Sequence, residues 1–324
     1  MATQMVKSEE IKSEKIKPEK IRKRKKFSFE NLELYGMITP SVIYFIIFAY
    51  LPMVGLIIAF KDYNYVDGIF GSPWSGFDNF KFLFESGKVW SLAKNTIVYN
   101  LAFLVTTIIA EVILAVLLSE IVGKRLKKFC QSVMILPNFI SWVVVGVFVY
   151  NFLNFESGVF NRLLLSMGKD PVHFYAETGA WPYILVLANL WKGAGYGSII
   201  YLATITGIDT TIYEAAEIDG ANVWQRIRHI TLPLLTPTII TMSLLSVGRL
   251  LRGNFDLFYQ LIGNNGMLYE STDIIDTYIF RALLSSPNIG MSSAVGFLQS
   301  VLCFVVIVIV NKAVKAYEKD YALF

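Results

Sequence analysis

Six long apolar stretches constrain this chain more than any other feature, because each is long enough to cross a lipid bilayer as an α-helix. A helix that crosses the hydrocarbon core needs about 20 predominantly apolar residues. Of the 324 residues, 55% are hydrophobic and 17% are charged, where a soluble domain carries roughly a quarter charged residues. We therefore predict an all-α integral membrane protein with six transmembrane helices. The predicted spans cover residues 36–60, 95–118, 129–152, 181–204, 234–261 and 291–314.

Lysine and arginine gather in alternate segments between the apolar stretches, and this asymmetry predicts the orientation. Cytoplasmic loops of membrane proteins carry an excess of Lys and Arg, so we expect these segments and both termini to be cytoplasmic. We divide the chain into a cytoplasmic basic arm, residues 1–30, and a transmembrane domain, residues 31–324. The arm is expected to be a solvated tail that helps to set the topology, with attraction to anionic lipid as the alternative. The cation-rich segments are residues 7–26, 124–128, 226–228 and 312–319.

The sequence shows no set of residues for catalysis or metal binding. No G-x-x-x-x-G-K-[ST] motif occurs, so this chain lacks the loop that cradles nucleotide phosphates. His173 and His229 are expected on opposite sides of the membrane, and no nucleophile pairs with a base. Cys130 and Cys303 are far apart, and we expect no disulfide. The first 30 residues lack the apolar core of a cleavable signal peptide. We predict that the chain is not an enzyme and binds no cofactor or metal.

A polar sequence, EAAEIDGANVWQRIRHITLPLLTP, separates the fourth and fifth stretches and predicts an ordered elbow. Thr211 and Glu214 fit a capping box that would start a helix. Gly220 permits a left-handed turn after it. A second short helix is expected over residues 222–230, with Pro233 ending it. From these residues alone two interpretations stay open: an interfacial helix that links two spans, or a docking knob for another subunit.

The same stretch resembles the EAA signature of permeases from ATP-binding cassette (ABC) importers. The matching residues are Glu214-Ala215-Ala216, then Gly220-Ala221, then Leu232-Pro233. Three further segments, LPNFISWVVVGVFVYNF, GFDNFKFLF and NFDLFYQLI, are similar to permeases of carbohydrate importers, and to the polysaccharide type in particular. Among these, the chain is similar to the permeases of bacterial alginate importers. The resemblance covers nearly the whole chain and implies the type I permease fold, with a cytoplasmic coupling helix at about residues 208–233.

The resemblance also implies partners. In this family the elbow inserts into a cleft of an ATPase subunit, which binds ATP and Mg²⁺. Two permeases, two ATP-binding subunits and an external solute-binding protein form the complex, and the segments 75–84 and 264–286 could meet the binding protein. Glu214 is expected to pair with a cation of the ATPase, to cap its own helix, or both. The candidate coupling residues are Glu214, Ala215, Ala216, Asp219, Gly220, Ala221, Leu232 and Pro233.

Polar residues within the fourth and fifth stretches predict a solute path. A charged side chain near the middle of a span costs at least about 2.5–3.5 kcal/mol, so one that is present there usually faces a wet cavity or a partner. The fourth stretch contains Lys192 in NLWKGAGY, where Gly193, Gly195 and the following Gly197 are expected to loosen the helix. The fifth contains Arg249, Arg252 and Asp256. Either arginine could pair with Asp256 on one helix, and the i+4 spacing of Arg252 is the better geometry. A positive excess remains, which favours a hydroxyl-rich, acidic ligand.

Similarity to maltose-type permeases implies ligand contacts on three of the spans. Lys192 replaces an apolar residue of that family, which favours a uronic-acid oligosaccharide over a neutral one. Two alternatives stay open: Lys192 could pair with Glu111, and Trp191 and Tyr196 could be core residues. The candidate substrate-binding residues are Asn189, Lys192, Gly193, Tyr196, Asn138, Trp142, Arg249 and Asn254.

We therefore expect the membrane-spanning permease subunit of an ATP-driven importer for an oligosaccharide of acidic, uronate or alginate-like type. It should be a multi-pass protein of the bacterial cytoplasmic membrane that contacts lipid and a second homologous permease but no nucleic acid. The alternative function is a secondary transporter or channel for a polar solute that needs no ATPase. Such a protein usually shows inverted repeats, and we find none here. A membrane-embedded enzyme is a weaker alternative, since no catalytic set is present.

Overall fold

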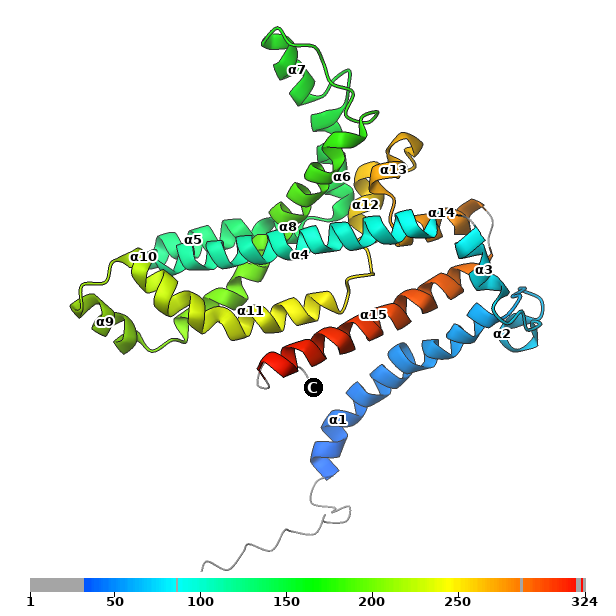
Figure 1. The fold of residues 1–324 in the computed structure, drawn as a ribbon, viewed down its shortest axis with the longest axis horizontal. Helices are drawn as coiled ribbons and strands as arrows, with labels where there is room; N and C mark the ends of the chain where they lie inside the picture. The colour runs from blue at the N-terminus through cyan, green and yellow to red at the C-terminus, as the bar shows by residue number, and fades with distance from the viewer. Residues whose placement is uncertain (1–31, 86, 286–287, 319–321, 323–324) are drawn as a thin grey trace, which may run out of the picture. The chain divides into compact units, whose positions relative to one another are not determined.

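The computed structural model describes residues 32–85, 87–285, 288–318 and 322, and within these ranges every regular element is a helix (Figure 1). The basic arm, residues 1–30, lies outside the described residues. The chain divides into two units, residues 1–54 and 55–324, which are described one at a time.

The described part of the first unit is one apolar helical run. It consists of α1 (Leu32–Phe45), the π-helix η2 (Ile46–Tyr50) and the start of the 3-10 helix η3 (Leu51–Phe60). Its apolar side chains are exposed along this run, Phe48 among them. The run corresponds to the first predicted span and is long and apolar enough to cross a membrane.

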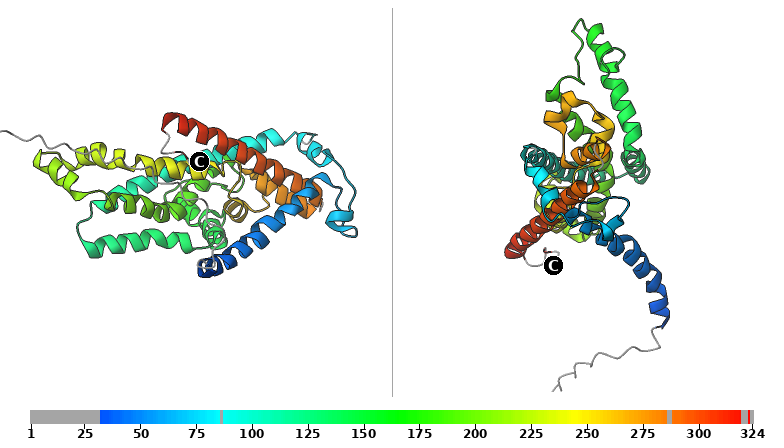
Figure 2. Two further views of the ribbon diagram at one scale, coloured as in Figure 1. Left: turned by 90° about the horizontal axis from the view of Figure 1, so that it is seen from below. Right: turned by 90° about the vertical axis from the view of Figure 1, so that its right-hand side faces the viewer.

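The second unit is built around two long helices that pack side by side, α4 (Val89–Ser119) and α8 (Trp181–Thr206) (Figures 1 and 2). A Cβ atom at Gly197 would lie 1.7 Å from Oε1 of Glu111, and one at Gly195 would lie 1.8 Å from the Met134 carbonyl oxygen. The prediction that glycines loosen this span is therefore wrong: α8 runs unbroken, and these two glycines let neighbouring helices approach it closely.

The third predicted span is bent rather than straight. Helices α5 (Lys124–Ile135) and η4 (Leu136–Phe139) are followed by α6 (Trp142–Leu153), which turns away by 93° (Figure 1). Ile140 is extended at the bend, and the Ser141 hydroxyl caps α6 by accepting the Val144 N–H at 3.4 Å. The local sequence thus ends one helix and starts another where hydropathy indicated a single rod.

The fifth predicted span has different bounds in the structure. Helices α10 (Val223–Arg226), η6 (Ile227–Thr231) and α11 (Leu232–Val247) form one helical stretch. In the π-helix η6 the N–H of Leu232 donates to the carbonyl of Ile227, five residues back, so the helix continues into Pro233 instead of ending there. The chain then leaves the helix after Val247, and the last residues of the predicted span belong to a separate helix, α12 (Phe255–Ile262).

Shorter helices complete the second unit. Helix α12 packs against α6, where a Cβ atom at Gly146 would lie 2.4 Å from the Gln260 carbonyl oxygen. The last helix of the unit is long: α15 (Ile289–Tyr317) corresponds to the sixth predicted span. The remaining elements are α2 (Gly68–Gly71), α3 (Asp78–Glu85), α7 (Val159–Ser166), η5 (Thr178–Ala180), α9 (Thr210–Ile218), η7 (Gly266–Leu268), α13 (Tyr269–Thr272) and α14 (Ile275–Ser285).

By length and composition, four helical stretches of the described residues can cross a membrane, and the bent pair of α5–η4 and α6 would make a fifth. Helix α8 is 26 residues long, or about 39 Å, but Asn189, Lys192 and its glycines make it less apolar than these. The four stretches are Leu34–Phe60, Val89–Ser119, Val223–Val247 and Ile289–Ala316.

Candidate functional sites

Helix α9 begins the elbow, at one end of the α4–α8 pair (Figure 1). Its N-cap is Asp209, whose carboxylate accepts the Thr211 N–H at 3.0 Å. This hydrogen bond lowers the pKa of Asp209 below its usual range. The predicted capping box at Thr211 and Glu214 is therefore wrong, because a stronger cap starts the helix earlier. Glu214 lies inside the helix and is exposed, so it does not cap its own helix.

The end of α9 forms a Schellman motif. Gly220 has φ +80°, which confirms the predicted left-handed turn. Its N–H donates to the Glu217 carbonyl at 3.0 Å, and the Ala221 N–H donates to the Ala216 carbonyl at 2.9 Å. The Ala221–Ala216 bond joins the Gly-Ala pair to the Glu-Ala-Ala segment, so the separation of these two motifs in the sequence is the one that closes the turn.

A capping box that sequence analysis missed starts the second helix of the elbow. The Asn222 side chain accepts the Gln225 N–H at 2.9 Å, and the Gln225 side chain accepts the Asn222 N–H at 2.8 Å. The signal was present in the sequence as Asn-x-x-Gln after the turn.

Two side-chain contacts join the halves of the elbow. The hydroxyls of Tyr213 and Thr231 are 3.0 Å apart, and Arg226 forms an ion pair with Glu217 at 3.4 Å. With a closed turn between them, the two helices form one stiff body.

The tip of the elbow exposes apolar side chains beside acidic ones. Ile218 is 87% exposed and Trp224 is 69% exposed. Of the candidate coupling residues, Ala216 and Ala221 are half-buried and the others are exposed. An apolar surface rimmed by polar groups suits protein docking. The exposed set is Glu214, Ala215, Asp219, Gly220, Leu232 and Pro233.

Three candidate substrate residues meet at the bend that follows α5. The Lys192 ammonium donates to the Asn138 carbonyl at 2.7 Å and lies 5.5 Å from the centre of the Trp142 ring. No ion pair among the described residues joins Lys192 to Glu111, which instead faces Gly197 further along α8. The alternative of a Lys192–Glu111 pair is therefore wrong.

The other candidates on α8 lie apart from this cluster. The Asn189 amide donates to the Thr107 hydroxyl on α4 at 3.2 Å. Trp191 is 49% exposed and Tyr196 is 54% exposed, so neither is a core residue of this chain. A Cβ atom at Gly193 would meet nothing within 4 Å, so this glycine is not required by packing.

The break between α11 and α12 exposes backbone carbonyl groups, which two side-chain amides satisfy. The Asn100 amide of α4 donates to the carbonyls of Leu250 at 2.8 Å and Arg252 at 3.3 Å. The Gln299 amide of α15 donates to the Leu251 carbonyl at 2.7 Å. The sequence analysis did not predict a role for Asn100 or Gln299, although a polar amide inside an apolar stretch is a signal that can be read from the sequence.

The positions of Asn100 and Gln299 along their helices show how far the break lies from the helix starts. Asn100 lies 11 residues after Val89, about 16 Å along α4, and Gln299 lies 10 residues after Ile289, about 15 Å along α15. These two helix starts lie at the end of the pair opposite the elbow (Figure 1). The hydrocarbon core is about 30 Å thick, so we expect the break to lie within it. Non-helical backbone at such a depth occurs where it is buried in protein or lines a wet cavity.

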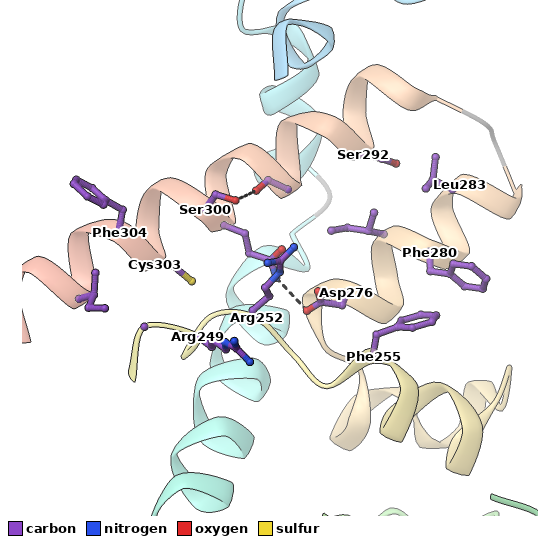
Figure 3. A pocket seen from close by; sticks show the side chains of 15 residues that line it. Arg249, Arg252, Phe255, Asp276, Phe280, Leu283, Ser292, Ser300, Cys303 and Phe304 are labelled. Carbon is purple, nitrogen blue, oxygen red and sulfur yellow. Dashed lines mark hydrogen bonds between the residues drawn. The ribbon is translucent and has the colours of Figure 1, made fainter. Parts of the chain in front are cut away.

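A cavity of about 580 Å³ adjoins the break (Figure 3). Arg249 and Arg252 line it from the break, Asp276 from α14, and Gln299 from α15. Oδ2 of Asp276 accepts the N–H of Gly253 at 2.8 Å and the Gln299 amide at 3.1 Å.

The predicted pair of Arg252 and Asp256 is absent from the described ion pairs. Helix α12 starts only at Phe255, so the two residues do not share a helix, and both are exposed. The candidate Asn254 caps α12, since its side chain accepts the Leu257 N–H at 3.3 Å.

Comparison with known proteins identifies the family. Residues 111–318 match the family model described as "Binding-protein-dependent transport system inner membrane component". The chain belongs to this family. It is 34% identical over 301 residues to the polygalacturonan/rhamnogalacturonan transport system permease protein YteP of Bacillus subtilis (strain 168), which covers 92% of this chain and 93% of the relative.

Two crystal structures share the fold of this inner membrane component. One is of a bacterial ABC transporter involved in the import of the acidic polysaccharide alginate, with a TM-score of 0.80, 35% identity, and coverage of 89% of this chain and 97% of that chain. The other is of a bacterial alginate ABC transporter in complex with an alginate pentasaccharide-bound periplasmic protein, with a TM-score of 0.80, 34% identity, and coverage of 90% and 96%.

These comparisons confirm the predicted fold class. The chain is an all-α, multi-pass inner membrane permease of a binding-protein-dependent transport system. The roles assigned to individual residues stay predictions.

Proposed function

We propose that this permease takes up an acidic oligosaccharide, driven by ATP hydrolysis in partner subunits. The observation that carries this proposal is the broken fifth span, where two arginines line a cavity between apolar helices. An arginine within a membrane-spanning segment usually faces a wet path or a partner. Relatives named for polygalacturonan or alginate transport support a uronic-acid ligand.

The elbow supports coupling to separate ATPases. Its two helices are joined by a closed turn and by two side-chain contacts, so a push at the tip would move the long helix that continues through α11. The sequence has no phosphate-binding loop of its own. We place one of the two ATP-binding subunits, with its ATP and Mg²⁺, at the exposed Ile218 and Trp224, and the other at the elbow of the second permease. The elbow and both termini are then cytoplasmic.

The open cavity supports a second permease. Both guanidinium groups are exposed, so this chain alone encloses only part of a path. A homologous chain would supply the remaining wall. At the opposite end from the elbow, residues 75–84 and 264–285 are available to the solute-binding protein.

Reconstitution of the complete complex in lipid vesicles tests this function. With binding protein present, we expect uronate oligosaccharides to stimulate ATP hydrolysis and uptake, and neutral oligosaccharides of equal length to stimulate much less. An equal response to both classes would contradict the acidic ligand. Uphill uptake by the permeases alone, without ATPase or ATP, would instead favour a secondary transporter.

A further inference from the structure

We infer that Arg249 and Arg252 bind the carboxylates of the transported sugar, whereas Lys192 is a positioning residue that holds the bend before α6. This inference rests on the proposed function and assigns its charge selectivity to one place, the cavity beside the broken span (Figure 3).

The two arginines are available for an anion. Both are exposed, and neither forms an ion pair with any carboxylate of the described residues. Asp276 lines the same cavity, and its Oδ2 accepts the Gly253 N–H and the Gln299 amide, while Arg252 is near enough to attract the carboxylate without forming an ion pair. A guanidinium has five N–H donors in a planar fork that matches a carboxylate. Two guanidinium groups on one cavity, with the single carboxylate of Asp276 beside them, leave an excess of positive charge that favours a ligand with its own negative charge.

The spacing of the arginines fits a chain with one carboxylate per sugar ring. They are three residues apart on one turn, where the Arg252 N–H donates to the Arg249 carbonyl at 2.8 Å. Both line the same cavity. A polyanionic sugar can present successive carboxylates to two such neighbours.

Other lining groups suit the rest of a sugar. Phe255 and Phe280 line the cavity, with ring centres 4.9 Å apart. The Ser292 hydroxyl oxygen is buried, lines the cavity and has no hydrogen-bond partner among the described residues. Aromatic faces and a spare hydroxyl serve sugar rings and their hydroxyl groups.

Lys192 differs because its charge already has partners. Its ammonium donates to the Asn138 carbonyl at the end of η4 and lies over the Trp142 ring at the start of α6. These contacts join α8 to both sides of the 93° bend. An ammonium held in this way stabilises the bend and has less to offer a ligand.

The test compares charge-removing variants in the reconstituted complex, with uronate oligosaccharide as the probe. Arg249→Gln/Arg252→Gln should raise the half-saturating concentration for uptake at least about tenfold, since the charged hydrogen bonds to the ligand are lost. It should also flatten the dependence of uptake on salt. Arg249→Lys/Arg252→Lys keeps the charge and should recover part of the affinity and the salt dependence.

Two controls make the result decisive. Arg162→Gln/Lys169→Gln removes equal charge from exposed residues outside the cavity and should behave as wild type. Lys192→Gln should lower thermal stability and maximal rate but keep the salt dependence. Wild-type affinity and salt dependence in the double-glutamine variant would overturn the inference while leaving the proposed function standing. A wild-type complex that ignores uronates would instead overturn the proposed function.

Discussion

Gly220 offers a quantitative test of whether the elbow must be stiff. Its φ of +80° closes the Schellman motif at the end of α9. A Cβ atom there would meet nothing within 4 Å, so a substitution strains only the backbone. For a residue with a Cβ atom, the left-handed region costs about 1–2 kcal/mol. At about 1.4 kcal/mol per tenfold, Gly220→Ala should populate the opened turn about 5- to 30-fold more often, and Gly220→Val more still.

Hydrogen exchange of the amides at the turn measures this opening directly. We expect the Ala221 amide, which donates to the Ala216 carbonyl, to exchange faster by about the same factor in Gly220→Ala. The transport rate should be lower in Gly220→Ala than in wild type and lower still in Gly220→Val, while uronate binding to the complex stays constant. Gly220→Asn is the matched control, because asparagine tolerates the left-handed region. The reasoning is refuted if Gly220→Val exchanges and transports as wild type does, or if asparagine is as damaging as valine.

Two further predictions concern helix contact and pH. Gly195→Ala should lower the thermal unfolding temperature, because its Cβ atom would lie 1.8 Å from the Met134 backbone carbonyl oxygen; Gly193→Ala, with no neighbour within 4 Å, should not lower it. Asp209 has a lowered pKa in the folded chain, so its cap is fully formed above its ordinary pKa of about 3.9 and is lost as pH falls through the lower, folded value. The hydrogen-exchange rate of the Thr211 backbone amide, relative to an unprotected amide, should rise over that acidic range. Asp209→Asn should abolish this pH dependence.

Much of the coupling elbow was predictable because its determinants are local. The turn needs a glycine at one position, and the hydrogen bonds that close it join residues at most five apart. The start of α9 was predicted wrongly for an equally local reason: Asp209 and Thr211 are both good caps, and only the backbone shows which one accepts the hydrogen bond.

The candidate substrate path was predictable only in part. The sequence indicates that Lys192 and Arg249 are too polar for a lipid-facing helix. It does not indicate that Lys192 reaches a carbonyl 54 residues earlier, or that Arg249 lies in a break. Those outcomes depend on which helices pack together.

The amino-acid sequence by itself determined that this chain spans a membrane, where the long helices α4 and α15 run, and how the elbow turns, since hydropathy and backbone torsion act on neighbouring residues. Only the tertiary structure decided the bend after α5, the break after Val247 and the cavity beside that break. The physical reason is that an interrupted helix within a membrane needs partners for its free carbonyl groups. Here Asn100 and Gln299 provide them, from helices about 150 residues before and about 50 residues after the break.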